Sequence, residues 1–222
     1  FPKSVYAVMD TLKYFIANKK NALVVDFFAG SGTTMHAVNL LNSIDNGHRR
    51  CIMVTNNEVS ADEAKALDEK GYKPGDKEWD RLGIAKYVTW PRTVCSIKGC
   101  NIDGKPLDGN YGCNVEQYTE IDGEIVNPET GKKIRGKVYK KEKEPAYPEL
   151  ANLKMSDGFK TNAAFFKLSF LDKTSVALGR QFRELLPVLW MKGGAVGKCP
   201  ALENDNLPNM LILPQNKMAV LV

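Results

Sequence analysis

The sequence predicts an α/β fold built on a parallel sheet. Three observations carry this prediction: an apolar run at 22–27, a glycine-rich turn directly after it, and a second apolar run at Cys51–Thr55. A helical pattern at 32–44 separates the two runs, so together they form a β-α-β unit, whose crossover makes the strands parallel. With 222 residues, the chain is long enough for one sizeable core, or for one domain with a smaller appended one.

Residues 1–98 are expected to form the first domain. Ser4 precedes apolar residues at three- and four-residue spacing, which predicts a capped helix that leads into the first strand. Three further elements are expected after the second strand: a helix at Ala61–Glu69, a loop at 71–76 and a short third strand at Lys86–Trp90. Tyr87 and Trp90 are expected in the core.

Residues 99–148 are expected to form a hairpin-rich excursion. Four turn pairs separate short polar segments there: Asp103-Gly104, Asp108-Gly109, Asp122-Gly123 and Thr130-Gly131. Seven Lys or Arg residues lie between Lys132 and Lys143. They favour a solvated hairpin, and a surface that touches phosphates is the alternative.

Residues 149–222 are expected to form a carboxyl-terminal α/β extension. The expected elements are a strand at Ala163–Leu171, a helix at Val176–Met191 kinked or split by Pro187, and strands at Leu211–Leu213 and Met218–Val222. The last strand is apolar up to the final residue, so we expect the extension to be truncated.

Composition excludes several classes of protein. No apolar run approaches the roughly 20 residues that a membrane-spanning helix needs. Five cysteines without a Cys-x-x-Cys pair, and only two histidines, predict free thiols in the cytoplasm and no metal site. The formal charge of +5 permits contact with a polyanion, but solvated lysine-rich faces give the same excess.

The turn after the first strand is the main candidate site. It reads Asp26-Phe27-Phe28-Ala29-Gly30-Ser31-Gly32-Thr33-Thr34, a strand end followed by glycines that open a helix. Glycines allow close approach to a ligand, and the helix start offers unpaired N–H groups. Glu58 follows the second strand, where a carboxylate can hold ribose hydroxyls; a helix-capping carboxylate is the alternative. His36 is expected to be a packing residue.

The nonapeptide is neither a Gly-x-Gly-x-x-Gly fingerprint nor a P-loop. It resembles the cofactor motif of β-type (permuted) amino DNA methyltransferases, especially Mod-like subunits of restriction-modification systems. Phe1-Pro2-Lys3-Ser4 resembles the motif that opens a helix before this turn in the same family. The resemblance is strong over residues 1–60 and weaker to about 98.

The resemblance implies a Rossmann-like, partial S-adenosylmethionine-dependent methyltransferase sheet. It places Lys3 and Ser4 near the methionine end of S-adenosyl-L-methionine, Asp26–Thr34 around the methionine and sugar, and Glu58 on the ribose. For Lys3, a lysine in solvent is the alternative.

The chain departs from the family in one respect, since it contains no Pro-Pro sequence. The family's Asp/Asn/Ser-Pro-Pro-Tyr/Phe motif grips the target amine, so no catalytic residue is assigned here. In the permuted order that motif precedes the cofactor turn, and the chain is therefore expected to be a carboxyl-terminal fragment, inactive alone.

The expected parent is a site-specific DNA methyltransferase, with adenine-N6 favoured over cytosine-N4 as its target. Double-stranded DNA, a restriction subunit and a second copy of the chain are its expected partners. Two alternatives stay open: an S-adenosylmethionine enzyme acting on RNA or a small molecule, and a non-catalytic module for DNA binding or assembly.

Overall fold

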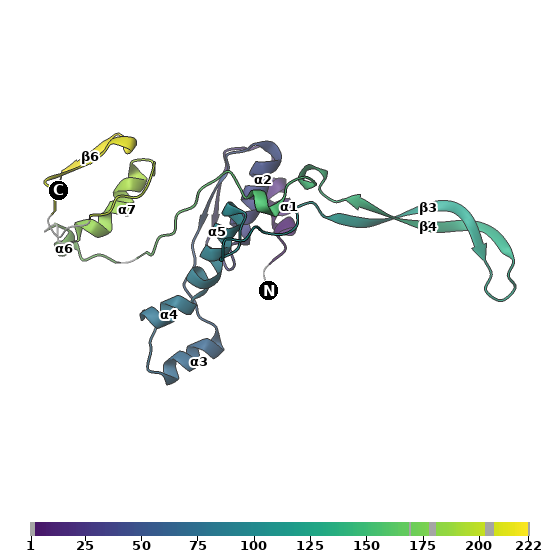
Figure 1. Ribbon diagram of the computed structural model, residues 1–222, viewed down its shortest axis with the longest axis horizontal. Coiled ribbons are helices and arrows are strands. Elements are labelled where there is room, and N and C mark those ends of the chain that lie inside the picture. The colour runs from purple at the N-terminus through teal and green to yellow at the C-terminus, as the bar shows by residue number, and fades with distance from the viewer. Residues whose placement is uncertain (1–2, 169, 178–180, 203–206, 222) are drawn as a thin grey trace. The chain divides into compact units, whose positions relative to one another are not determined.

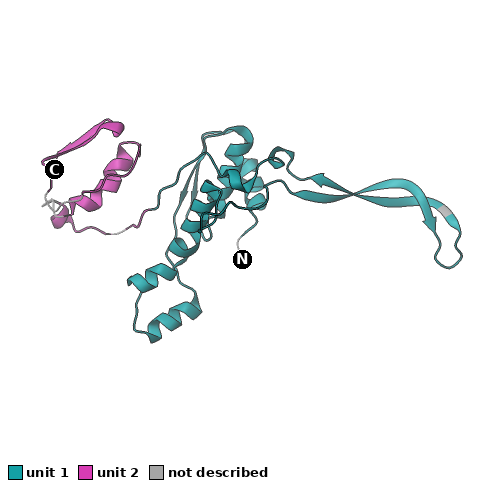
Figure 2. Cartoon of the chain, in the orientation of Figure 1, with its two compact units in different colours: residues 1–165 teal, residues 166–222 magenta. Residues whose placement is uncertain are grey.

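The computed structural model describes residues 3–168, 170–177, 181–202 and 207–221. They belong to two compact units, Phe1–Phe165 and Phe166–Val222, shown in different colours in Figure 2.

The first unit is built on the predicted β-α-β arrangement (Figure 1). Its elements are α1 (Val5–Ile16), β1 (Leu23–Asp26), α2 (Thr33–Asp45) and β2 (Arg50–Met53). β1 and β2 pair in parallel, with Val24 opposite Cys51. The predicted unit is thus confirmed, and the described sheet contains these two strands.

The main core lies where α1 and α2 pack together. Met9 of α1 and Leu40 of α2 are fully buried in it. Later segments of the chain complete the cluster with Tyr111, Leu150 and Phe159. On the strands, Val24 and Cys51 are half-buried, whereas Val25 and Ile52 are 45% and 49% exposed. One face of the small sheet is therefore apolar and open.

Arg49 joins the carboxyl end of α1 to the start of β2. Its guanidinium donates to the carbonyls of Ile16 (3.0 Å) and Ala17 (2.7 Å) and to both carboxylate oxygens of Asp45 (2.9 Å each). Helix carbonyls at a carboxyl end lack intrahelical partners, and a cation satisfies them well. The end of α1 is therefore held at the edge of the sheet where β2 begins.

Tyr111 joins the opposite ends of the same helices. Its carbonyl accepts a hydrogen bond from the Tyr6 hydroxyl (2.8 Å), and its own hydroxyl lies 2.9 Å from His36 Nε2. Tyr6 is in the first turn of α1 and His36 in the first turn of α2. Both helix starts therefore lie at the edge where β1 ends.

The regular elements between β2 and the hairpin region are all helical. They are α3 (Ala61–Glu69), α4 (Lys77–Leu82), a π-helical turn (Ala85–Thr89) and α5 (Trp90–Lys98). The helix at Ala61–Glu69 is confirmed, and the strand predicted at Lys86–Trp90 is wrong. Ala85 and Thr89 are buried while Tyr87 is 64% exposed, a helical spacing of buried positions that overrides the strand preference of Val88 and Trp90. Tyr87 is not a core residue, and Trp90 is half-buried.

The hairpin region forms one long two-stranded ribbon (Figure 1). Its strands are β3 (Asn114–Val126) and β4 (Lys133–Pro145), which pair antiparallel. The turn predicted at Asp122-Gly123 is wrong, because this pair lies inside β3. The turn predicted at Asp103-Gly104 is confirmed, because it lies between Cys100 and Pro106, which form an antiparallel bridge. Gly123 faces Gly136 across the ribbon, so this glycine pair marks a place without side chains in the ladder and not a turn. Only the Thr130-Gly131 pair lies at the ribbon's tip.

The second unit contains α6 (Lys173–Ala177), α7 (Phe182–Lys192), β5 (Met210–Leu213) and β6 (Met218–Leu221). The two predicted strands are confirmed over their described residues and pair with each other antiparallel; Val222 of the second prediction lies outside the described residues. Of the helix predicted at Val176–Met191, Val176 and Ala177 belong to the end of α6. The later part of the predicted helix forms α7, which begins at Phe182 and continues through Pro187 without splitting. Residues 178–180 of that prediction lie outside the described residues.

The strand predicted at Ala163–Leu171 is wrong. Its described residues have no regular structure, and Leu168 and Phe170 are each 96% exposed. A strand needs a neighbour for its backbone groups, and this stretch pairs with none of the described strands. Across the described ranges, every helix is too short or too polar to traverse a bilayer.

Candidate functional site

Asp26 shapes the turn that follows β1. Its Oδ1 accepts the N–H of Phe28 (2.9 Å) and its Oδ2 accepts the hydroxyl of Thr34 (2.6 Å). The carboxylate thus ties the strand end both to the first residues of the turn and to the first turn of α2. The residue that follows β2 supports the turn as well, because Val54 O accepts the N–H of Ala29 (3.3 Å).

Gly30 and Gly32 supply backbone conformations that other residues adopt at a cost. Their φ values are +51° and +80°, in the left-handed region. Gly32 is also tightly enclosed, since a Cβ at this position would lie 3.2 Å from Cγ2 of Thr89. The turn therefore requires glycine at Gly32 for both conformation and space.

The start of α2 leaves hydrogen-bond donors open. Gly32 is its N-cap and provides no side-chain cap. The N–H groups of Thr33, Thr34 and Met35 have no backbone partner among the residues that the structure describes. Unpaired amides at the positive end of a helix favour a ligand that offers oxygen atoms or negative charge.

Thr89 and Arg92, which the sequence did not single out, form hydrogen bonds with the turn. The Thr89 hydroxyl donates to the carbonyl of Gly30. Arg92 Nη1 donates to Ser31 Oγ (2.8 Å) and lies 3.3 Å from both Ser31 O and Thr33 Oγ1. No motif marks these residues. The buried positions Ala85 and Thr89, four residues apart, show that this segment is helical, but their burial is known only from the structure.

Lys3 and Ser4 are brought to the same end of the fold as the turn. Ser4 caps α1 by accepting the N–H of Ala7 (3.5 Å), and Tyr111 holds the starts of α1 and α2 together. Lys3 and Ser4 are both exposed. No described hydrogen bond joins either side chain to the turn, so their predicted role stays a prediction.

Glu58 lies just beyond β2 with an exposed side chain. Its carbonyl accepts the N–H of Ile84 (2.7 Å), which fixes the backbone there. The alternative that Glu58 caps the next helix is wrong, because Ser60 is the N-cap of α3 and pairs with Glu63 in a capping box. The carboxylate is thus left pointing to solvent, and ribose binding stays a prediction.

Aromatic residues and His36 complete the surroundings of the turn. Phe27 and Phe28 are 66% and 92% exposed, so they form an apolar surface beside the glycines. His36 packs edge-on against Tyr111 and Phe159, which confirms its predicted packing role. Burial, with a smaller effect of the nearby Arg92, lowers the pKa of His36 to about 4. This side chain is therefore neutral at physiological pH.

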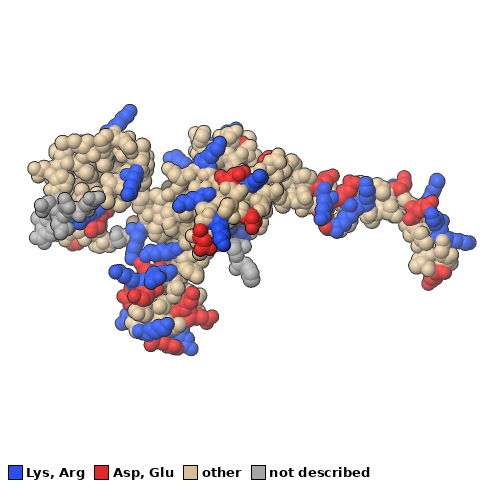
Figure 3. Space-filling model, in the orientation of Figure 1, with Lys and Arg blue, Asp and Glu red and all other residues tan. Residues whose placement is uncertain are grey.

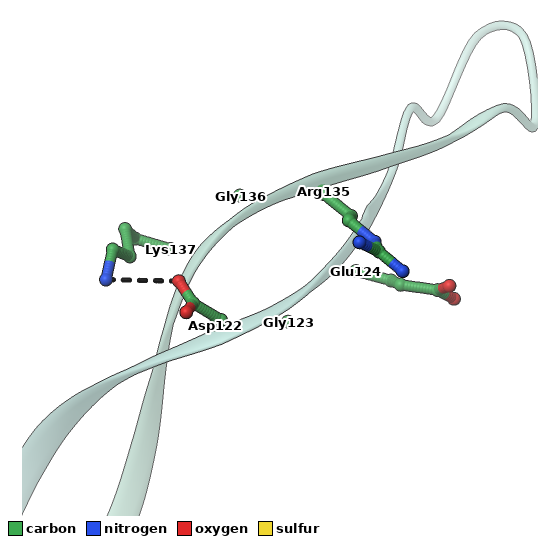
Figure 4. A pocket seen from close by; sticks show the side chains of 6 residues that line it. All are labelled: Asp122, Gly123, Glu124, Arg135, Gly136 and Lys137. Atoms are coloured by element: carbon green, nitrogen blue, oxygen red, sulfur yellow. Dashed lines mark ion pairs between the residues drawn. The ribbon is translucent and has the colours of Figure 1, made fainter.

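The hairpin lacks a matching site. Its cations and carboxylates alternate along the ribbon (Figure 3), and four lysines pair with acidic residues: Lys133, Lys137, Lys140 and Lys141. A hollow on this ribbon is lined by Asp122 and Lys137, which pair at 3.1 Å, and by Gly123, Gly136, Glu124 and Arg135 (Figure 4). It contains none of the predicted site residues. The described residues hold no group of His, Cys, Asp and Glu suited to a metal ion.

Part of the chain is similar to a curated methyltransferase and to two Mod subunits of restriction-modification enzymes, and no family model matches the chain. A stretch of 56 residues is 45% identical to Type II methyltransferase M.KpnI from Klebsiella pneumoniae. A stretch of 58 residues is 50% identical to the Type III restriction-modification enzyme EcoPI Mod subunit from Escherichia phage P1. Forty residues are 55% identical to the Type III StyLTI Mod subunit from Salmonella typhimurium.

These matches cover 25%, 26% and 18% of this chain. The chain in turn spans only 13%, 9% and 6% of the length of these relatives. At the level of the family, the similarity relates this part of the chain to DNA methyltransferases of restriction-modification systems.

Proposed function

We propose that the first unit carries the S-adenosyl-L-methionine site of a β-type amino DNA methyltransferase. The observation that supports this most is the β1–α2 turn, where two left-handed glycines and an uncapped helix start present open amides. The similarity to restriction-modification methyltransferases favours this cofactor over NAD or ATP. We further infer that β1, α2 and β2 belong to a larger Rossmann-like sheet.

The residues at the turn suit the different parts of the cofactor. In our proposal, the open amides of α2 and the turn Asp26–Thr34 hold the methionine and sugar. Lys3 and Ser4, at the start of α1, lie near the methionine end. The exposed carboxylate of Glu58 accepts the ribose hydroxyls, because one carboxylate can take both hydrogen bonds.

The bound cofactor supplies an activated methyl group on sulfur. The chain's own task is positioning, since a fixed donor in line with a nucleophilic amine accounts for much of the rate of a transfer. The target amine would belong to a base flipped out of duplex DNA, with adenine-N6 favoured over cytosine-N4. The chain contains no Pro-Pro motif to grip that base, so we propose that it does not methylate DNA by itself.

Calorimetry with S-adenosylhomocysteine tests the cofactor site. We expect binding by the wild-type chain and at least a tenfold loss in the Gly32→Ala variant. Gly104→Ala is the matched control, because Gly104 has the same φ of +80° but nothing within 4 Å of an added Cβ. Equal affinities of the two variants, or no binding by the wild-type chain, would contradict the proposal.

A methyl-incorporation assay tests the proposal that this chain does not methylate DNA by itself. Radiolabelled cofactor and duplex DNA should give no labelled DNA with this chain alone, and label incorporation would overturn the proposed division of labour. Double-stranded DNA, a restriction subunit and a second copy of the chain are the partners we propose for the whole enzyme in the cytoplasm. The neutralised charge of the ribbon does not favour the alternative of a separate DNA-binding module.

A further inference from the structure

We infer that Arg92 is a positioning residue that keeps the cofactor turn open, an inference that rests on the function proposed above. Arg92 lies in α5, some sixty residues after the turn, and its Nη1 reaches three oxygen atoms of Ser31 and Thr33. These contacts fix the Ser31 carbonyl and keep the Ser31 and Thr33 hydroxyls from the first amides of α2.

Two hydroxyls beside the start of α2, those of Ser31 and Thr33, face Arg92. Ser and Thr side chains beside a helix start commonly accept hydrogen bonds from the first backbone amides. Here Ser31 Oγ and Thr33 Oγ1 lie 3.2 Å apart and both face Arg92 Nη1, at 2.8 and 3.3 Å. The start of α2 has no side-chain cap, and in our inference the guanidinium keeps these two hydroxyls directed away from its first amides. The amides of the first turn remain available to a ligand.

Thr89 and Arg92 also hold the backbone of the turn. Gly30 and Gly32 give this backbone conformational freedom, which contacts with other segments help to restrict. Thr89 fixes the carbonyl of Gly30, and Arg92 Nη1 lies 3.3 Å from the carbonyl of Ser31. The π-helical turn and the start of α5 therefore form a clamp, defined as Thr89 and Arg92, behind the ligand-facing side.

The clamp predicts a binding defect without a general loss of folding. Arg92→Ala should weaken S-adenosylhomocysteine binding about tenfold, which corresponds to the loss of one charge-assisted hydrogen bond. Arg92→Met retains the length of the side chain but donates nothing, so it should be as weak as Arg92→Ala. Arg92→Lys restores a donor and should recover part of the affinity. The exposed Arg81 on α4 provides the control Arg81→Ala, with unchanged binding.

A double-mutant cycle with Ser31→Ala tests whether Arg92 acts through that hydroxyl. Ser31→Ala should lower the affinity for S-adenosylhomocysteine less in the Arg92→Ala background than in the wild type, because the Ser31 hydroxyl and the Arg92 guanidinium act together. Additive effects of the two substitutions, or full recovery by Arg92→Met, would overturn the inference.

Hydrogen exchange of the cofactor-free protein separates this inference from the proposed function. The amide of Ala29 is bonded to Val54 O, just after β2, and the amide of Gly32 is bonded to Ala29 O within the turn. Arg92→Ala should speed their exchange severalfold and leave α1 unchanged. Unchanged exchange at both amides would refute the clamp even if the cofactor binds. Faster exchange in a chain that binds no cofactor would support the clamp and reject the proposed function.

Discussion

Replacing Arg49 by alanine tests the joint that orients α1 against the sheet. The Arg49 side chain is fully buried, and the carboxylate of Asp45 with which it pairs is 25% exposed. Alanine would leave that carboxylate and the carbonyls of Ile16 and Ala17 without their cation. Burying such polar groups without a hydrogen-bond partner costs free energy of folding.

The expected loss follows from the number and kind of these bonds. Breaking a buried ion pair by removing one partner costs about 3–5 kcal/mol. For a unit of this size, about 1 kcal/mol lowers the melting temperature by roughly 2–4 °C, so a fall of roughly 10 °C is expected. Arg49→Lys should lie between the wild type and alanine, because an ammonium cannot reproduce the planar fork of donors.

Denaturant unfolding followed by circular dichroism measures this loss. Arg50→Ala is the matched control, since the neighbouring Arg50 is exposed and should change stability by no more than about 0.5 kcal/mol. Equal stabilities of the Arg49→Ala and Arg50→Ala variants would refute the reasoning.

The ion pair of Arg49 and Asp45 also makes the stability of the first unit depend on pH. The hydrogen bond from Arg49 holds the pKa of Asp45 below its ordinary value. The stability that the pair provides is therefore present above the unfolded pKa of about 4 and is lost as pH falls through the lower folded value. The Arg49→Ala variant should lack this contribution to acid unfolding.

Further predictions concern the core and the base of the hairpin. The pKa of His36 is lowered to about 4, so stability should fall as pH drops from about 6.5 towards 4, by up to about 3 kcal/mol. His36→Gln should flatten that part of the stability profile, and an unchanged profile would contradict the assignment. Tyr147→Phe removes the hydrogen bond to Asp10 at 2.5 Å but keeps the stack on Tyr6, and should cost about 1 kcal/mol in urea unfolding. Tyr6→Leu, which removes the stack, should cost more than Tyr147→Phe.

Local patterns in the sequence were enough to predict the centre of the first unit. Apolar runs, the turn Asp26–Thr34 and the cap at Ser4 specify their own structure through contacts between near neighbours. For that reason α1, β1, α2, β2 and α3 lie close to their expected positions. The same locality explains why Glu58 was placed correctly after β2, although its proposed partner is a ligand.

Only the tertiary structure determined the surroundings of that turn. Val88 and Trp90 suit a strand by composition, yet Thr89 and Arg92 find their partners some sixty residues earlier in the chain, and a helix presents both to the turn. Tyr111 likewise joins two helix starts that lie about 30 residues apart. Such contacts depend on which surfaces meet after folding, and no spacing within a short segment records them. The sequence by itself determined the turn with its glycines and the helix start that follows, whereas the packing of α5 decided what holds the turn in place.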